Sequence, residues 1–211
     1  MLPLRLFAVL SAVLVAVHGH GMLIDPPNRG SMWRFGFKTP PNYDDDGQFC
    51  GGREVQIANG GKCGECGDDY RLPRPRPAEN GGLYGQGIIV DTYREGQVIT
   101  AVTELTANHW GYFEYKLCPL GQPTEMETEE CFSKYPLPLA DGSGYRYYLL
   151  SKEEGKYPVK LKLPEGLTCD QCVLQWTYRT ANTWGMCPNG TGADGCGPQE
   201  HFRTCSDIAI H

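Results

Sequence analysis

Histidine, a side chain well suited to binding a metal ion, occurs at five positions: His18, His20, His109, His201 and His211. If His20 were the first residue of a mature chain, it would offer two nitrogens to one ion, its α-amine and its imidazole. A second histidine would add a third nitrogen and complete a planar, T-shaped site. Such nitrogen ligands favour Cu(II), which also heads the affinity order for divalent first-row metals. The sequence therefore predicts a copper site whose affinity falls in acid, because the α-amine must lose its proton.

Residues 1–19 have the pattern of a secretory signal peptide. Arg5 precedes an apolar run at 6–17 that is too short to span a membrane as a mature helix. Signal peptidase prefers small residues before its cut, and a cut after Gly19 satisfies this better than one that exposes His18. We therefore expect a secreted mature chain of residues 20–211 that begins with His20.

His109 is the preferred partner of His20. It follows Leu105-Thr106-Ala107-Asn108, at a turn between two expected strands, where its side chain can point out of the end of a sheet. His201 and the C-terminal His211 are weaker candidates. The competing interpretation is that His20 is a solvated terminus and His109 an ordinary hydrogen-bonded loop residue, and only the N-terminal position of His20 weighs against it.

Charge and hydropathy exclude several classes of partner. The formal charge of the chain is −6, and loss of Arg5 with the signal peptide makes it −7. Scattered positive charge argues against nucleic acid, which needs a basic footprint. The mature part has neither a membrane-spanning stretch nor the apolar tail of a lipid anchor. We expect one monomeric domain that acts on an uncharged substrate.

The cysteines of an exported chain are expected to form disulfides. The chain has ten: Cys50, Cys63, Cys66, Cys118, Cys131, Cys169, Cys172, Cys187, Cys196 and Cys205. Two C-x-x-C pairs, 63/66 and 169/172, also suit a zinc site, although export favours oxidation. The sequence leaves the disulfide connectivity open. Asn189, in Asn-Gly-Thr, is the expected N-glycosylation site.

The hydrophobic pattern predicts an all-β fold. Residues 20–87 are rich in Gly, Pro, Asn and Asp and are expected to form long loops stapled by disulfides. Short runs rich in β-branched and aromatic residues follow, and helical periodicity is absent. We expect an immunoglobulin or fibronectin III-like β-sandwich with strands near 87–93, 98–105, 110–117, 145–150, 157–163, 173–178 and 207–210.

Five segments in a fixed order carry a resemblance that spans the mature chain: HGML at 20–23, FCGG at 49–52, NGGKCGECGD at 59–68, LTANHWGYF at 105–113 and QEHFRTCSDI at 199–208. Together they resemble the lytic polysaccharide monooxygenases, copper enzymes that cut polysaccharides oxidatively, and in particular auxiliary activity family 15. The resemblance implies one copper ion per chain, an external reductant, and hydrogen peroxide or dioxygen as co-substrate. Hydrogen would be removed from C1 or C4 beside a glycosidic bond of crystalline chitin or cellulose.

The resemblance also implies roles for individual residues. His20 and His109 would be the copper ligands, and Phe202 matches the aromatic residue on one axial side of the metal. Many members have Tyr there, so the redox behaviour of this site is expected to differ. Ala107 matches the small residue on the other axial side. Glu200, with its neighbour Gln199, is a candidate polar group near the metal.

A crystalline polymer presents a flat face, and exposed aromatic rings are the expected contacts. Trp33, Tyr43 and Trp184 are the candidates because they stand in loop-like sequence, whereas Tyr112, Phe113 and Trp176 are expected in the core. Two competing functions remain at this point: a non-catalytic chitin-binding protein, and a copper-carrying protein with no polysaccharide surface.

Overall fold

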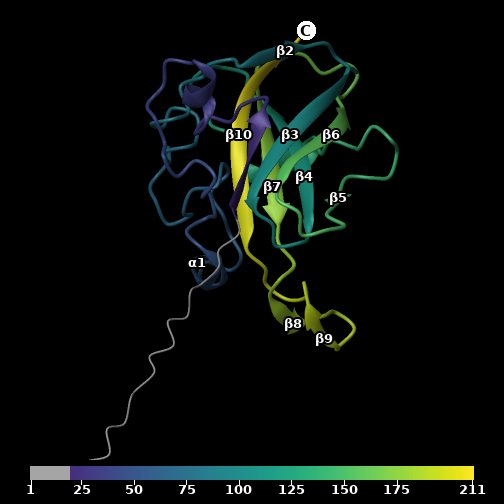
Figure 1. The fold of residues 1–211 in the computed structure, drawn as a ribbon. Coiled ribbons are helices and arrows are strands. Elements are labelled where there is room, and N and C mark those ends of the chain that lie inside the picture. Colours follow the sequence, from purple (N-terminus) through teal and green to yellow (C-terminus); the bar gives the residue numbers. More distant parts are fainter. Residues whose placement is uncertain (1–19) are drawn as a thin grey trace, which may run out of the picture.

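Two layers of mainly antiparallel strands form the body of the protein (Figure 1); only β2 runs parallel to its neighbour β10 among the described strands of these layers. The computed structural model describes residues 20–211; the predicted signal peptide, 1–19, lies outside the described residues. One layer has the strand order β1-β3-β6 and the other β2-β10-β7-β4-β5. Their bounds are β1 His20–Asp25, β2 Asp91–Tyr93, β3 Val98–Ala107, β4 Tyr112–Pro119, β5 Tyr147–Tyr148, β6 Gly155–Lys162, β7 Cys169–Arg179 and β10 His201–Ile210. The structure is the predicted immunoglobulin-like β-sandwich.

The core lies between these layers and explains why the strands form. In β3, buried and more exposed residues alternate, as expected for a strand with one face on the core. The buried side includes Ile99, Ala101 and Leu105, which face Phe113, Trp176 and other residues of the second sheet in one continuous cluster. Phe113 and Trp176 are fully buried, as predicted. The prediction that Tyr112 lies in the core is wrong, because it is only partly buried and packs against Tyr148 at the sheet edge.

Some strands depart from the prediction. β1 lies within the segment expected to be loop, and the expected strand at 145–150 is reduced to Tyr147–Tyr148. β10 begins six residues earlier than 207. A further two-stranded hairpin, β8 (Trp184–Met186) with β9 (Gly192–Asp194), projects from the lower end of the sandwich in Figure 1. Short helices occur at η1 (Met32–Phe35), α1 (Arg53–Ala58) and α2 (Glu129–Lys134).

All ten cysteines form disulfides, so the zinc interpretation of the C-x-x-C pairs is wrong. Oxidised sulfurs cannot serve as the thiolate ligands that zinc requires. The bridges are Cys50–Cys63, Cys66–Cys205, Cys118–Cys131, Cys169–Cys172 and Cys187–Cys196. The pair 63/66 is split between two bridges, whereas 169/172 closes on itself.

A long loop region, residues 26–90, packs beside β10 and is anchored by buried charge. The Arg29 guanidinium donates two hydrogen bonds of 2.7 Å to Asp207 on β10 and a third to Glu127. All three side chains are buried. Burial opposes the charge of Arg29, but Asp207 and Glu127 outweigh it and raise the pKa of Arg29. Within residues 20–211, no helix is long and apolar enough to cross a membrane.

Candidate metal centre

His20 is the first residue of β1. The purple ribbon of this strand begins toward the lower end of the sandwich in Figure 1. Its Cα is paired with that of Ala107, the last residue of β3. The next residue fixes this pairing, because the Gly21 N–H donates to the Asp46 carbonyl at 3.0 Å. A Cβ on Gly21 would lie 2.4 Å from Leu105 Cδ2, so only glycine allows β1 to approach β3 this closely. His20 is therefore held beside the end of β3.

His109 lies two residues beyond Ala107, in the tight connection from β3 to β4, as predicted. The His109 N–H donates to the Tyr178 hydroxyl at 2.7 Å, and the His109 carbonyl accepts from the Ala181 N–H at 2.9 Å. Gly111 follows with φ +98°, and a Cβ there would meet the Arg179 carbonyl oxygen at 1.9 Å. The connection bearing His109 is thus pinned to the C-terminal end of β7.

Phe202 is the buried aromatic side chain next to His20. Its ring centroid lies 6.3 Å from that of His20 and 6.4 Å from that of Phe49. On its other side it stacks on Tyr178, its partner in the β10–β7 register, at 5.8 Å and 27°. Phe202 is 1% exposed, so its position is set by packing on several sides. The structure brings His20, Ala107, His109 and Phe202 to one end of the sandwich.

The polar neighbours of Phe202 differ in what they do. Glu200 is buried and lines a cavity of about 390 Å³ between α1 and the segment before β8. The Gln199 amide instead holds the chain that leads into the hairpin. It accepts from the Thr183 N–H at 3.1 Å and donates to the carbonyls of Thr183 and Cys196. Gln199 therefore ties two loop segments together, whereas Glu200 lines the cavity, and its role as a polar group near the metal stays a prediction.

The other two mature histidines lie elsewhere. His201 faces α1, with its Nδ1 3.4 Å from Gln56 Nε2. Burial, together with the charges of Arg203 and Arg179, lowers the pKa of His201 to about 4. His211 lies at the opposite end of β10, where its ring is exposed and 4.0 Å from Asp170. Neither position favours these residues as the partner of His20.

The three candidate surface aromatics are divided between two places. Trp184 is 63% exposed on β8, and its ring covers Gly192 on the facing strand. Trp33 belongs to η1, and its ring packs edge-on against Tyr43 at 5.4 Å. In Figure 1, η1 lies toward the upper end of the molecule, far from the hairpin. Trp184 thus lies on the side of the molecule where β1 begins, and the Trp33–Tyr43 pair lies away from it.

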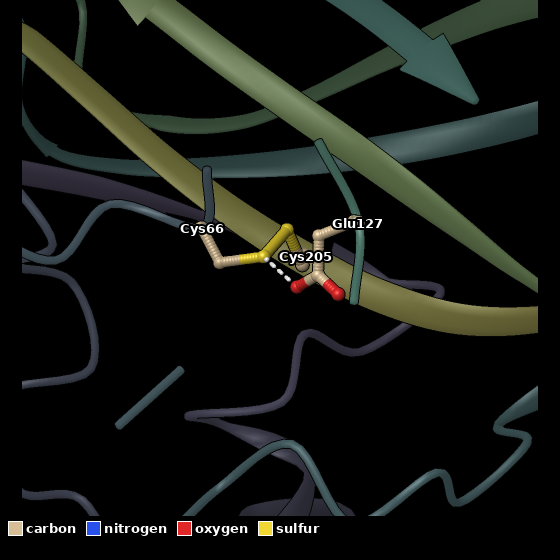
Figure 2. Close-up of side chains that lie close together, drawn as sticks. All are labelled: Cys66, Glu127 and Cys205. Carbon is tan, nitrogen blue, oxygen red and sulfur yellow. Dashed lines mark hydrogen bonds between the residues drawn. A yellow bond between two sulfur atoms is a disulfide. The ribbon is translucent and has the colours of Figure 1, made fainter. Parts of the chain in front are cut away.

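One other group of potential metal-binding side chains lies close together among residues 20–211, and its chemistry excludes a metal. Figure 2 shows Cys66, Cys205 and Glu127, with Glu127 Oε1 2.9 Å from the Cys66 sulfur. The two sulfurs form a disulfide with each other. The Glu127 carboxylate also accepts hydrogen bonds from Arg29 and from the Asn80 N–H. The oxidised sulfurs cannot bind a metal as thiolates.

The donors at the His20 end do fit copper. They are the imidazole of His20 at the start of β1, the imidazole of His109 just beyond the end of β3 and, if the chain is cut after Gly19 as predicted, the α-amine of His20. Such a set of neutral nitrogens suits Cu(II) better than calcium or magnesium, which take oxygen ligands. The neighbouring Phe202 ring adds a buried apolar side to the site.

Two residues that help to build this end were not singled out from the sequence. Tyr178 was recognised only as part of a strand, although the alternation of that strand marks its side chain as inward. Asp46 stands in a run of three aspartates that has no distinctive pattern. Its carbonyl accepts from Gly21, and its carboxylate accepts from the Thr106 hydroxyl at 2.7 Å. Asp46 thereby joins β1 to β3 next to His20.

Comparisons with known proteins agree with this architecture. Residues 20–208 match the family model described as lytic polysaccharide mono-oxygenase, cellulose-degrading. A solved structure, the lytic polysaccharide monooxygenase AA15 from Thermobia domestica in the Cu(I) state, is 55% identical in sequence. It covers 90% of this chain and 98% of its own, with a TM-score of 0.89. Curated protein sequences gave no match.

The matched range begins at His20 and extends into β10, so it contains His20, His109 and Phe202. The high identity and near-complete coverage of the solved structure support the same family and the same metal. The chain therefore belongs to the lytic polysaccharide monooxygenases of auxiliary activity family 15 and is a copper-dependent oxidoreductase.

Proposed function

We propose that this chain is a secreted, monomeric enzyme that cleaves crystalline chitin, cellulose or both by oxidation at C1 or C4 of the sugar ring. One copper ion would be held by the α-amine and imidazole of His20 and by His109. The observation that carries the proposal is the β1–β3 register, which puts His20 opposite Ala107, two residues before His109. The matching family's description, which names cellulose, supports a polysaccharide substrate.

Each residue of the site would have a distinct task. When bound, copper would supply the redox chemistry by which hydrogen peroxide or dioxygen oxidises the polymer, with an external reductant as the source of electrons. His20 and His109 hold the metal at an end of the sandwich, where a flat substrate can reach it. Phe202 and Ala107, which both lie next to His20, would limit the space around the metal. Glu200 offers a buried carboxylate near the site, suited to hold or move a proton.

The β8–β9 hairpin would extend the contact with the polymer. Trp184 is exposed and its ring lies against Gly192, so it is available to contact a sugar. Trp33 and Tyr43 lie away from the hairpin, and we expect a smaller contribution from them. Asn189 is exposed in the hairpin turn, and its Oδ1 accepts from the Thr191 hydroxyl at 2.8 Å. We expect a glycan on Asn189 to border the same surface.

Product analysis tests the proposal directly. Mature protein that begins at His20 is incubated with copper, ascorbate and either β-chitin or cellulose, and soluble products are identified by mass spectrometry. Oxidised oligosaccharides that disappear without ascorbate are expected. Polymer binding without oxidised products would instead indicate a non-catalytic binding protein. Copper uptake with no polymer affinity would indicate a copper carrier.

Two variants test the ligand set. His109→Ala should lose copper affinity and oxidised products while the disulfide-bonded fold stays intact. A chain that retains Gly19 before His20 should be equally impaired, because its α-amine is replaced by an amide. Full activity in either variant would contradict the assignment of the copper ligands.

A further inference from the structure

Tyr178 connects two parts of the candidate copper site that are distant in sequence. It lies on β7, between β10 and β4, and is fully buried. Its ring stacks on Phe202 at 5.8 Å and meets Phe113 edge-on at 5.3 Å. Its hydroxyl accepts the hydrogen bond from the His109 N–H at 2.7 Å. One side chain therefore contacts both the axial aromatic and the backbone of a proposed copper ligand.

The backbone at His109 depends on such external contacts. The next two residues, Trp110 and Gly111, have φ values of +56° and +98°. A non-glycine residue seldom adopts a positive φ unless its surroundings impose it. Tyr178 and Ala181 each make a hydrogen bond to the backbone of His109. The end of β7 and the residues just after it therefore help to fix the backbone that carries the His109 side chain.

The phenol is suited to this task because its oxygen can accept the hydrogen bond from the His109 N–H at 2.7 Å while its ring packs on Phe202. The hydrogen bond is buried, so its loss would not be replaced readily by water.

We propose that Tyr178 is a positioning residue of the copper site, acting through its hydroxyl on His109 and through its ring on Phe202. This inference rests on the proposed assignment of His109 as a copper ligand. Residues that orient metal ligands without touching the metal typically change metal affinity by about 10–100-fold when they are replaced. Tyr178→Phe removes only the hydroxyl, so we expect Cu(II) affinity to fall about tenfold.

Tyr115 offers a matched control. It lies on the neighbouring strand β4, is equally buried, and its hydroxyl bonds the Thr103 hydroxyl at 3.3 Å. Tyr115→Phe therefore deletes a comparable buried phenol oxygen from the same sheet, away from His109. If Tyr178 acted only in the core, the two variants would behave alike.

The experiment compares mature wild-type protein, Tyr178→Phe and Tyr115→Phe. Cu(II) affinity is measured by competition with a chelator, the copper environment by electron paramagnetic resonance, and metal-free stability by thermal unfolding. We expect similar small losses of thermal stability in both variants. Only Tyr178→Phe should show weaker copper binding and an altered copper spectrum.

The outcomes separate this inference from the proposed function. Wild-type affinity and spectrum in Tyr178→Phe would overturn it, as would identical copper defects in both variants. A wild-type protein whose copper spectrum lacks nitrogen ligands would refute the proposed copper site itself. As a test that needs no variant, the His109 amide of metal-free protein should exchange slowly with deuterium, and rapid exchange would contradict the hydrogen bond to Tyr178.

Discussion

The copper-site end of the sandwich and the loop region beside β10 are held by different kinds of interaction. At the His20 end, uncharged contacts dominate: strand pairing, aromatic stacking on Phe202 and backbone hydrogen bonds to His109. In the loop region, the buried Arg29 pairs with Asp207 and Glu127. The first end must fix a few atoms precisely, while the second must anchor a long segment that has little apolar surface of its own.

The largest effect is expected in the charged region. Arg29→Met should lower the free energy of unfolding by about 3–5 kcal/mol, because two carboxylates are left buried without their partner. Guanidinium unfolding of the oxidised protein measures this change. The exposed pair Arg71–Asp69 supplies the control, since Arg71→Met should have no measurable effect. A loss in Arg29→Met no larger than that of the control would show that charge does not anchor the loop region.

A slightly smaller effect is expected at the copper-site end. Gly111→Ala should cost about 3 kcal/mol, because the new Cβ meets the Arg179 carbonyl in a backbone of positive φ. It should also weaken copper binding by moving His109. Gly36→Ala, at φ +90° with no atom within 4 Å, should cost only about 1 kcal/mol and leave copper binding unchanged. Equal losses of stability in Gly111→Ala and Gly36→Ala would contradict the steric explanation.

Buried charge in the loop region is not uniformly stabilising, and Asp68 shows this. Burial, with the neighbouring Glu79, raises the pKa of Asp68 to about 6 from a usual 3.8. The folded state then binds more protons than the unfolded state between these values, so this residue lowers stability as the pH rises from 4 through 6. Asp68→Asn should therefore raise the free energy of unfolding by about 2 kcal/mol at pH 7 and leave it unchanged below pH 4. Urea unfolding at both pH values checks the sign.

The smallest effect on stability is expected at the hairpin. Trp184 is exposed, so Trp184→Ala should change the free energy of unfolding by no more than about 0.5 kcal/mol. Binding of the Trp184→Ala variant to chitin or cellulose should nevertheless fall several-fold in a pull-down assay. Trp33→Ala is the comparison, with a smaller loss of binding because η1 lies away from the hairpin. A larger loss of polymer binding in Trp33→Ala than in Trp184→Ala would indicate that the polymer-binding surface lies near η1 instead.

The sequence predicts best the strands in which apolar and polar residues alternate. The sequence predicts the strands at 98–105, 157–163 and 173–178 from alternating residue types and from their β-branched and aromatic residues, although β7 proves to be buried on both faces. β1 was missed because four successive residues, Gly21–Ile24, are buried, which hides the period of two. β8 and β9 were missed because they are mostly exposed and are held by strand pairing and the Cys187–Cys196 bridge rather than by a core.

The sequence predicts the residues of the candidate copper site but not the residues that hold them in place. The resemblance supplied His20, His109, Ala107 and Phe202, and the fold brings all four to one end. The role of Tyr178 could not be predicted from the sequence. It depends on which buried hydroxyl lies within hydrogen-bond distance of the His109 N–H, and only the folded structure shows this. The disulfide connectivity also could not be predicted from the spacing of the cysteines, because Cys66 bonds Cys205, 139 residues away, rather than the nearby Cys63.

The burial of the sulfur atoms bears on the solution in which such an enzyme must work. The proposed reaction calls for an external electron donor, and thiol donors attack disulfides that they can reach. Cys66 and Cys205 are shielded by the protein, as are Cys50 and Cys172. Cys187 and Cys196 are more accessible. A thiol donor should therefore open the Cys187–Cys196 bridge first, loosening the hairpin that we propose contacts the polymer, while the bridges of the sandwich that carries the proposed copper ligands stay closed.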